Sequence, residues 1–426
     1  MTAQKNSPTP HEIHASHHET IKTVHSVRRW VVVLAGVVVA SWVVIGIAIF
    51  RSRASSPAGY GAYATTKPME PGNGPWGRLE YSPIVISSPL EYVAEGGADF
   101  SGPVMWHFPD MGSARLSTRL RRSGLDSAIV AELEKNARAN VSLPGMSIHP
   151  SKEFILSLNA SDRAKLYLML ADYPQNLDIR NQFLFRGDSP QQWFDGSDVS
   201  PATIKLVEPL IYKNGNFMYF ADMRSISADI PSRREQLELL RTLRRDVTFL
   251  AHIRLSEESD LEQLVNYWGR GGRIQDVRPI LESMMRREGG VINITHLLPP
   301  LARRRLYTYP AMSRSEQSVH RDCHWTSMNF FNEIPDDSVD MAKFHSEIKQ
   351  KFYRIHGNLQ LGDIAVVIDE RKTAVHSATY IADDVFFHRC GSDSSAPWTF
   401  VRGEDLKDYY TRSKKPILAY YRRRNM

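Results

Sequence analysis

The sequence predicts an α+β protein with a single N-terminal transmembrane helix, a mostly helical middle domain and a C-terminal domain whose antiparallel sheet packs on a cysteine-bearing helix. Three observations predict this organisation. Residues 30–50 are apolar and uncharged, helix-start signals recur between residues 116 and 301, and β-branched runs alternate with turns after residue 358. With 426 residues, 42% of them hydrophobic, the chain is long enough for two or three domains.

Residues 1–29 form a polar tail. Histidines are scattered through it among Ser, Thr and Glu, but no metal-ligand spacing repeats and no apolar residues support a fold. We therefore expect a disordered, solvated segment rather than a metal site.

Residues 30–50 form the predicted transmembrane helix. The stretch has 21 residues without a charge and is bounded by Arg28-Arg29 and by Arg51 and Arg53. At about 1.5 Å per residue it extends roughly 31 Å, enough to cross the hydrocarbon of a lipid bilayer. A cleaved signal peptide would have a shorter apolar core. The basic residues favour a cytoplasmic N-terminus, with the C-terminal domains in the periplasm or at the cell surface.

Residues 51–77 read as a linker, because prolines are mixed with Gly, Ala and Ser. Residues 78–304 follow as a mostly helical domain of unknown function. Asp126 precedes one apolar-periodic stretch, and capping-box patterns begin at Ser232 and Ser259. Arginines are frequent here. Their presence on solvent-exposed helix faces explains them better than a binding site for an anionic polymer does.

Charge and cysteine content exclude some classes of function. The net charge of +6 fits contact with an anionic wall polymer or lipid head groups, but it is too small to indicate nucleic-acid binding. Two cysteines cannot build a disulfide framework. No metal or other cofactor is expected.

Cys323 is the strongest candidate for chemistry. Asp322 is suited to cap the helix that the apolar spacing predicts after it, which places Cys323 in the first helical turn. Unpaired N–H groups at a helix start favour the thiolate, the nucleophilic form of cysteine. Such a nucleophile needs a base from another part of the fold.

Two histidines on predicted strands are candidates for that base. Residues 364–368 form a β-branched run, and a second strand over 373–382 carries His376 near its start. Asp383-Asp384 connects it to a third strand that carries His388. The two histidines are therefore expected to be diagonal neighbours, so that one imidazole can orient the other.

These residues resemble the NlpC-type family of papain-like cysteine peptidases, which are bacterial cell-wall endopeptidases. The resemblance rests on Asp322-Cys323 at a helix start, on residues 359–366, and on His376 followed twelve residues later by His388. It implies Cys323 as nucleophile, His376 as general base and His388 as the residue that holds its ring.

The resemblance covers residues 305–426 and implies a membrane-anchored cysteine hydrolase that cuts peptide or amide bonds of the cell envelope, with peptidoglycan stem peptides as substrate. Family members use a tyrosine before the cysteine, to which Tyr309 or Tyr307 corresponds; we assign Tyr309 and Asp322 to substrate binding and the oxyanion side of the site. His324 and Trp325 replace the small residues usual after the cysteine, so the cleft is expected to be narrowed.

Several alternatives remain open at this stage. The domain could be an inactive papain-like binding or scaffolding protein, or an acyltransferase or deamidase that uses the same three residues. Cys390 reads as an inert core cysteine, and His324 ranks below His376 as a base. An acid pair for glycoside chemistry, drawn from the aspartates between residues 188 and 222, is a weak rival.

Overall fold

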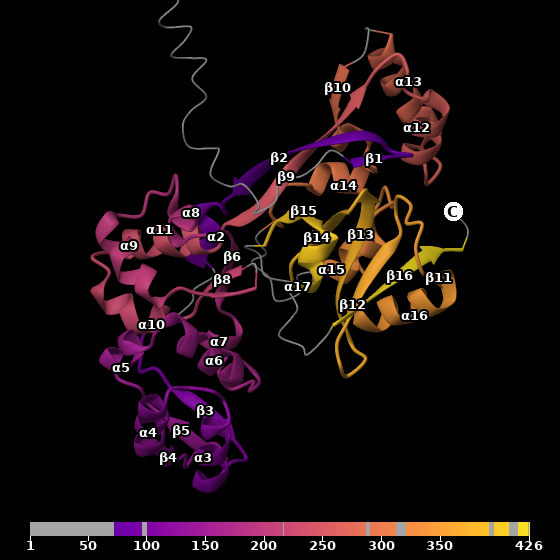
Figure 1. The fold of residues 1–426 in the computed structure, drawn as a ribbon. Coiled ribbons are helices and arrows are strands. Elements are labelled where there is room, and N and C mark those ends of the chain that lie inside the picture. The colour runs from indigo at the N-terminus through magenta and orange to yellow at the C-terminus, as the bar shows by residue number, and fades with distance from the viewer. Residues whose placement is uncertain are drawn as a thin grey trace, which may run out of the picture. The chain divides into compact units, whose positions relative to one another are not determined.

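The computed structural model describes residues 72–95, 100–215, 217–286, 290–311, 321–391, 396–408, 416–424 and 426. Every described residue belongs to one compact unit, Ala62–Met426. Within the described part, helices are combined with four sheets in an α+β arrangement (Figure 1).

The predicted fold class included a transmembrane helix, and that part of the prediction is wrong. Among the residues that the structure describes, no helix combines the length and the apolar composition needed to cross a membrane. Residues 30–50, to which that helix was assigned, lie outside the described residues, as do the tail 1–29 and most of the linker.

A four-stranded antiparallel sheet joins the start of the described chain to its middle. Its strands are, in spatial order, β1 (Gly72–Gly74), β2 (Gly77–Ile86), β9 (Asp246–Leu255) and β10 (Gly290–Asn293). The strands β2 and β9 pair along their whole length, from Arg78↔Arg254 to Ile86↔Asp246. The long pairing brings Asp246, at the start of β9, next to the end of β2.

In the middle region, short strands lie between the helices. They form two three-stranded sheets, β3 (Trp106–Pro109), β5 (Gly145–Ile148), β4 (Ala137–Ala139), and β6 (Phe183–Arg186), β8 (Phe217–Phe220), β7 (Tyr212–Asn214).

The helices of this region are α2 (Leu90–Glu95), α3 (Ser113–Arg121), α4 (Ser127–Asn136), α5 (Lys152–Ser157), α6 (Ala160–Ala171), α7 (Leu177–Arg180), α8 (Pro190–Phe194), α9 (Pro201–Val207), α10 (Met223–Ile226), α11 (Arg233–Leu243), α12 (Leu261–Trp268), α13 (Ile274–Met285) and α14 (Pro300–Arg305). Two begin where the sequence predicts a cap, since the side chains of Asp126 and Ser232 each accept a hydrogen bond from a backbone N–H in the first turn of α4 and α11. In α12 the cap is Asp260, one residue after the predicted Ser259.

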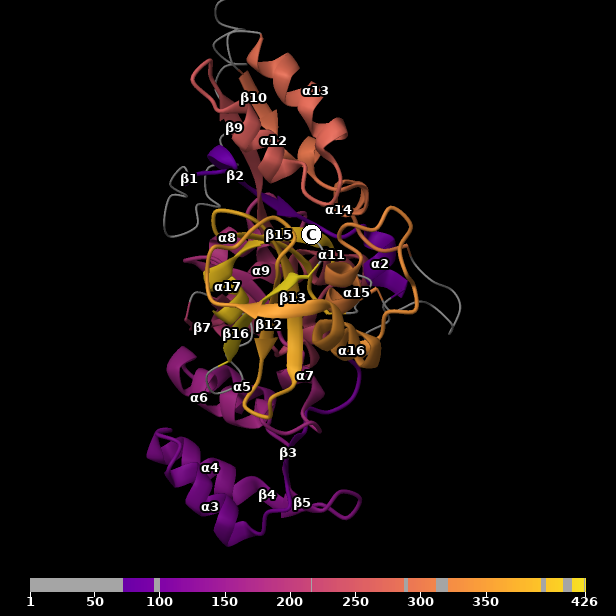
Figure 2. The same cartoon turned by 90° about the vertical axis from the view of Figure 1, so that its right-hand side faces the viewer.

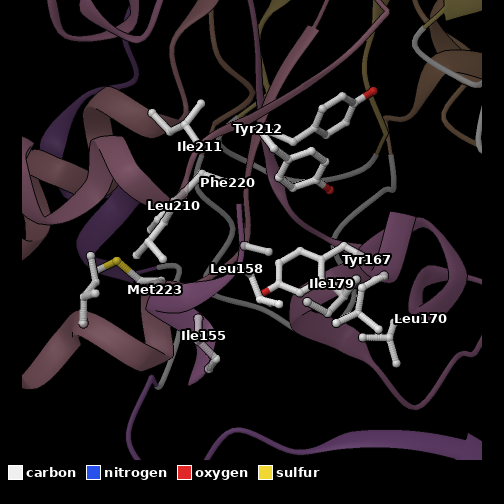
Figure 3. Packing of buried hydrophobic residues seen from close by; sticks show 14 of the residues in the cluster. Ile155, Leu158, Tyr167, Leu170, Ile179, Leu210, Ile211, Tyr212, Phe220 and Met223 are labelled. Carbon is white, nitrogen blue, oxygen red and sulfur yellow. The ribbon is translucent and has the colours of Figure 1, made fainter. Parts of the chain in front are cut away.

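One large apolar cluster holds the middle region together (Figure 3). Its aromatic members include both edge-to-face and stacked pairs; the rings of Tyr167 and Tyr212 lie 5.8 Å apart at 82°, and those of Tyr212 and Tyr219 lie 5.5 Å apart at 16°. A buried ion pair sits against this cluster. Arg163 Nη1 lies 2.6 Å from Asp222 Oδ2, and both side chains are at most 3% exposed.

The C-terminal part is a six-stranded antiparallel sheet in the spatial order β11 (Phe352–Ile355), β16 (Ile417–Arg423), β12 (Ile364–Ile368), β13 (Ala374–Ala382), β14 (Val385–Arg389) and β15 (Trp398–Arg402). Three helices accompany it, α15 (Cys323–Met328), α16 (Met341–Lys351) and α17 (Gly403–Asp408). The helices α15 and α16 lie beside strands β12 and β13 (Figure 2), and α15 contacts β13 and β14. The predicted strands 364–368, 373–382 and 385–388 are thereby confirmed.

The C-terminal sheet shares its hydrophobic core with the preceding sequence. One cluster contains Ile253 and Trp268 from before residue 305, together with Trp325 and Phe387 from after it. The hydroxyl of Thr248 also donates a 2.8 Å hydrogen bond to the carbonyl of Phe400. Residues 78–304 and 305–426, which were predicted as separate domains, therefore share one hydrophobic core.

Candidate functional site

The helix that carries Cys323 begins as predicted. Asp322 precedes the helix in an extended conformation, and its Oδ1 accepts a 2.9 Å hydrogen bond from the backbone N–H of Trp325. Cys323 is the first residue of α15. The carboxylate of Asp322 is thus used to cap the helix, which fixes where the helix starts.

Two buried tryptophans anchor this short helix. Trp325 donates through Nε1 to Asp337 Oδ1 at 3.0 Å, and Trp398 donates to the hydroxyl of Thr326 at 2.9 Å. Both indoles are fully buried. A helix of six residues is marginal alone, so these tertiary contacts stabilise it.

The expectation that His324 and Trp325 narrow a cleft is wrong. The His324 side chain is buried against Phe344, with ring centroids 4.2 Å apart, and its Nδ1 lies 3.0 Å from the hydroxyl of Ser377. Burial lowers the pKa of His324. Trp325 is also fully buried, so neither side chain projects into an open cleft.

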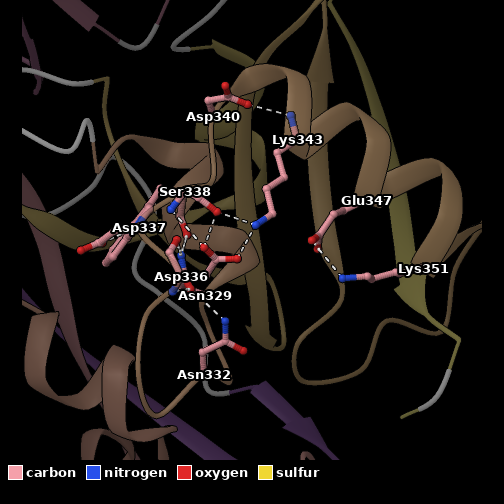
Figure 4. A network of polar contacts seen from close by, with 10 residues as sticks. Asn329, Asn332, Asp336, Asp337, Ser338, Asp340, Lys343, Glu347 and Lys351 are labelled. Atoms are coloured by element: carbon pink, nitrogen blue, oxygen red, sulfur yellow. Dashed lines mark hydrogen bonds and ion pairs between the residues drawn. The ribbon is translucent and has the colours of Figure 1, made fainter.

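A polar network holds the segment that follows α15 (Figure 4). The side chain of Asn329 donates to the carbonyls of Trp325 and Asp336 and accepts from the N–H of Asp336. Asp336 in turn pairs with Lys343 of α16, which lowers the pKa of the Asp336 carboxyl. The network joins the end of α15 to the first turns of α16.

The predicted pair of histidines comes together in the structure. His376 Nε2 lies 3.0 Å from His388 Nδ1, and the two rings meet at 87° with centroids 5.2 Å apart. They stand on neighbouring antiparallel strands, joined by a hairpin in which Thr379 faces Phe387. Both side chains are buried, at 0% and 5% exposure.

Ser377 connects the cysteine to the histidine strand. Its hydroxyl donates a 3.1 Å hydrogen bond to the backbone carbonyl of Cys323. The backbone N–H groups of Ser377 and His324 also favour the thiolate of Cys323. The sulfur of Cys323 therefore lies beside Ser377, the residue that follows His376.

Burial keeps the resting site uncharged. Cys323 is only 5% exposed, and burial, with a smaller contribution from the charge of Asp322, raises the pKa of its thiol to about 12. Burial lowers the pKa of His388 to about 4 and that of His376 well below its ordinary value. At neutral pH the thiol is thus protonated and both imidazoles are neutral.

Arg389 is a residue of this region that the sequence did not single out. The guanidinium is buried, donates to the carbonyls of Arg321 at 2.6 Å and Ala396 at 3.1 Å, and lies 5.2 Å from the Trp398 ring centroid. It ties the segment just before Asp322 to β14. An arginine in a strand is ordinarily solvent-exposed, so nothing in the sequence predicted this role.

The two candidate tyrosines have different surroundings. Tyr307 donates a 2.6 Å hydrogen bond to the carbonyl of Phe249 and belongs to the core. The ring of Tyr309 lies against Tyr92, with centroids 5.9 Å apart, and burial followed by the charge of Asp246 raises its pKa. Roles for Tyr309 and Asp322 in substrate binding remain predictions.

A cavity of about 740 Å³ lies beside the histidine pair. Its walls come from β6, β9, β14 and β15, and they include His388, Cys390 and Asp246. Cys323 and His376 are buried and do not belong to its lining. His388 is thus the predicted catalytic residue that a molecule in this cavity would meet.

Within the described residues, no group of three His, Cys, Asp or Glu side chains is arranged to hold a metal ion. Comparison of the chain with known protein families, with characterised proteins and with solved structures finds no match.

Proposed function

We propose that the protein is a cysteine-dependent hydrolase of peptide or amide bonds, with Cys323 as nucleophile, His376 as general base and His388 as the residue that orients His376. The observation that carries the proposal is the 3.0 Å bond between His376 Nε2 and His388 Nδ1. This bond fixes the ring orientation of His376, the candidate base. The next residue on the same strand, Ser377, donates a hydrogen bond to the backbone carbonyl of Cys323.

The hydrogen bond decides which atom of His376 acts. Because His388 engages Nε2, Nδ1 is the atom that takes the thiol proton. Nδ1 is free of a proton only in the tautomer in which His376 Nε2–H donates to His388 Nδ1. The same bond then stabilises the imidazolium that forms.

The reaction proceeds by proton transfer coupled to attack. As the proton moves from Cys323 Sγ to His376 Nδ1, sulfur bonds to the carbonyl carbon and the carbonyl electrons move to oxygen, which the backbone N–H of Cys323 stabilises. Collapse of this intermediate breaks the C–N bond, and His376 returns the proton to the leaving amine. His376 then takes a proton from water as the water oxygen bonds to the thioester carbon; the C–S bond breaks, the proton passes to Cys323 Sγ, and the carboxylic acid is released.

We propose peptidoglycan stem peptides as the substrate, which would place the enzyme in the cell envelope. The support is the resemblance of residues 305–426 to cell-wall endopeptidases. An acyltransferase or deamidase would use the same thiol and imidazole, and differs only in the group that accepts or leaves the acyl carbon.

A second candidate function is a binding or scaffolding protein without catalysis. The observation that favours it is the burial of Cys323, at 5% exposure, together with a thiol pKa raised to about 12. A thiol-directed probe separates the two functions. If Cys323 reacts at neutral pH no faster than Cys390 or free cysteine, even with peptidoglycan present, the site is not activated.

The deciding experiment is digestion of purified peptidoglycan with product identification by mass spectrometry. The unaltered chain is compared with Cys323→Ala, Cys323→Ser and Cys390→Ala, after circular dichroism shows that each variant is folded. We expect released peptides from the unaltered chain and from Cys390→Ala only. Equal products from both folded Cys323 variants would refute the proposal, and products of acyl exchange or deamidation would reassign the reaction.

A further inference from the structure

Asp246 lies in the same cavity wall as His388, although it belongs to a different sheet. It is the first residue of β9, whereas His388 is on β14. Thr399 of β15 connects them. Thr399 is directly opposite His388 in the strand register, and its hydroxyl lies 3.4 Å from Asp246 Oδ2. Opposed residues on antiparallel strands share one face of the sheet, so the carboxylate is one side chain away from His388.

Asp246 differs from the other carboxylates in this cavity. Asp178 forms an ion pair with Arg224, and Asp405 forms one with Arg186. Within the part of the chain that the structure describes, no ion pair includes Asp246. Burial raises the pKa of the Asp246 carboxyl to about 6, while the hydrogen bond from Thr399 opposes this.

The charged groups around Asp246 do not neutralise it. Arg245, also in the cavity wall, donates to the carbonyls of Trp193, Asp195 and Gly196. Arg244 lines the cavity without forming an ion pair within the described residues. Arg241 forms ion pairs with Glu238 and Asp198. The charge of Asp246 contributes to the raised pKa of Tyr309.

We infer that Asp246 is a positioning residue of the proposed catalytic site: its carboxylate favours the charged form of the His376–His388 pair when that pair takes the proton of Cys323. The inference rests on the proposed function. Because the imidazolium forms in a buried site, where charges are poorly screened, a carboxylate on the His388 side lowers the free energy of proton transfer. A protonated Asp246 lacks this effect.

The inference gives the reaction a pH dependence that Asp246 controls. As pH rises through about 6, Asp246 becomes ionised and the rate increases. Asp246→Asn has no ionisable group there, so its rate stays near the low-pH level. If the carboxylate shifts the basicity of the pair by about one pKa unit, kcat at pH 8 falls about tenfold in the variant, with KM unchanged.

The test is a pH profile from 5 to 8 of peptidoglycan hydrolysis and of Cys323 alkylation by iodoacetamide, both with the full chain carrying Cys390→Ala. We expect Asp246→Asn to lose about tenfold in both rates at pH 8 and little at pH 5. Thr399→Val should shift the rising limb to higher pH, because loss of its hydrogen bond raises the carboxyl pKa further.

Asp178→Asn is the matched control. Asp178 also lines the cavity, but it forms an ion pair with Arg224 and lies on α7, away from the histidine strands. Its profile should equal that of the unaltered chain. A uniform decrease at every pH in Asp246→Asn, or an unchanged profile, would refute the role of Asp246. If Cys323→Ala retains full hydrolysis, it is the proposed function that fails.

Discussion

The hydroxyl of Ser377 donates a hydrogen bond of 3.1 Å to the backbone carbonyl of Cys323. The same hydroxyl lies 3.0 Å from Nδ1 of His324. One strand residue thus holds the first turn of α15 beside the position of His376. The distance between a nucleophile on a helix and a base on a strand depends on such a connection, because neither element fixes it alone.

Replacing Ser377 by Ala should destabilise the protein. It leaves the buried His324 nitrogen without its partner, and we expect the free energy of unfolding to fall by about 1–3 kcal/mol. Urea denaturation measures the change. Thr379→Val, two residues along β13, is the control. Its buried hydroxyl has no hydrogen-bond partner within the described residues, so the change should be neutral or stabilising. Equal losses in both variants would contradict the prediction.

Protonation linked to His388 should lower the free energy of unfolding in mild acid. The folded-state pKa of about 4 lies below the ordinary value of 6.5, so the unfolded chain takes up the proton first. The contribution to stability is complete above pH 6.5 and is lost progressively as pH falls toward 4, by about 2 kcal/mol between pH 7 and pH 5 and by about 3 kcal/mol in all. Urea midpoints at pH 7 and pH 5 measure it. His388→Asn should show a smaller difference between the two pH values; an unchanged difference would exclude this source.

The buried pair of Arg163 and Asp222 should be sensitive to removal of one partner. Asp222→Ala leaves a fully buried guanidinium unpaired, and we expect a loss of about 3–5 kcal/mol. The double variant Arg163→Met, Asp222→Leu should recover most of it. The exposed pair of Arg119 and Asp172 is the control, because Asp172→Ala should cost about 1 kcal/mol or less. Chemical denaturation of all variants decides the outcome.

Arg389→Lys should lower both stability and the proposed activity. Lysine cannot reproduce the planar set of donors that binds the carbonyls of Arg321 and Ala396, so we expect a loss of about 1–2 kcal/mol. Movement of the segment before Cys323 should reduce kcat on peptidoglycan by about tenfold or more. Arg305→Lys is the matched control, since Arg305 stacks on Trp398 at 5.0 Å and is partly exposed. Equal effects of the two substitutions would contradict a specific role for Arg389.

The parts of the site that the sequence predicted are those with local signals. The cap at Asp322, the helix start at Cys323 and the hairpin turn at Asp383-Asp384 each depend on neighbouring residues. The approach of His376 to His388 follows from the hairpin, since a two-residue turn fixes which residues are near each other.

The parts that the sequence could not predict depend on tertiary packing. Asp246 and His388 are 142 residues apart and belong to different sheets, so no spacing rule relates them. The inward orientation of His324 and Trp325 depends on how α15 lies on the sheet. The transmembrane prediction used the length, uncharged composition and flanking arginines of residues 30–50, which lie outside the described residues, and none of the described helices is long and apolar enough to cross a membrane.

The strand β16 lies inside the C-terminal sheet, between β11 and β12, although it is the last strand of the sequence. It pairs with both neighbours, from Phe352↔Arg423 on one side to Ile368↔Ile417 on the other. A growing polypeptide on the ribosome therefore cannot complete this sheet until residues 417–423 have emerged. Without residues 417–423, β11 would lose its partner in the sheet and β12 would have an unpaired edge.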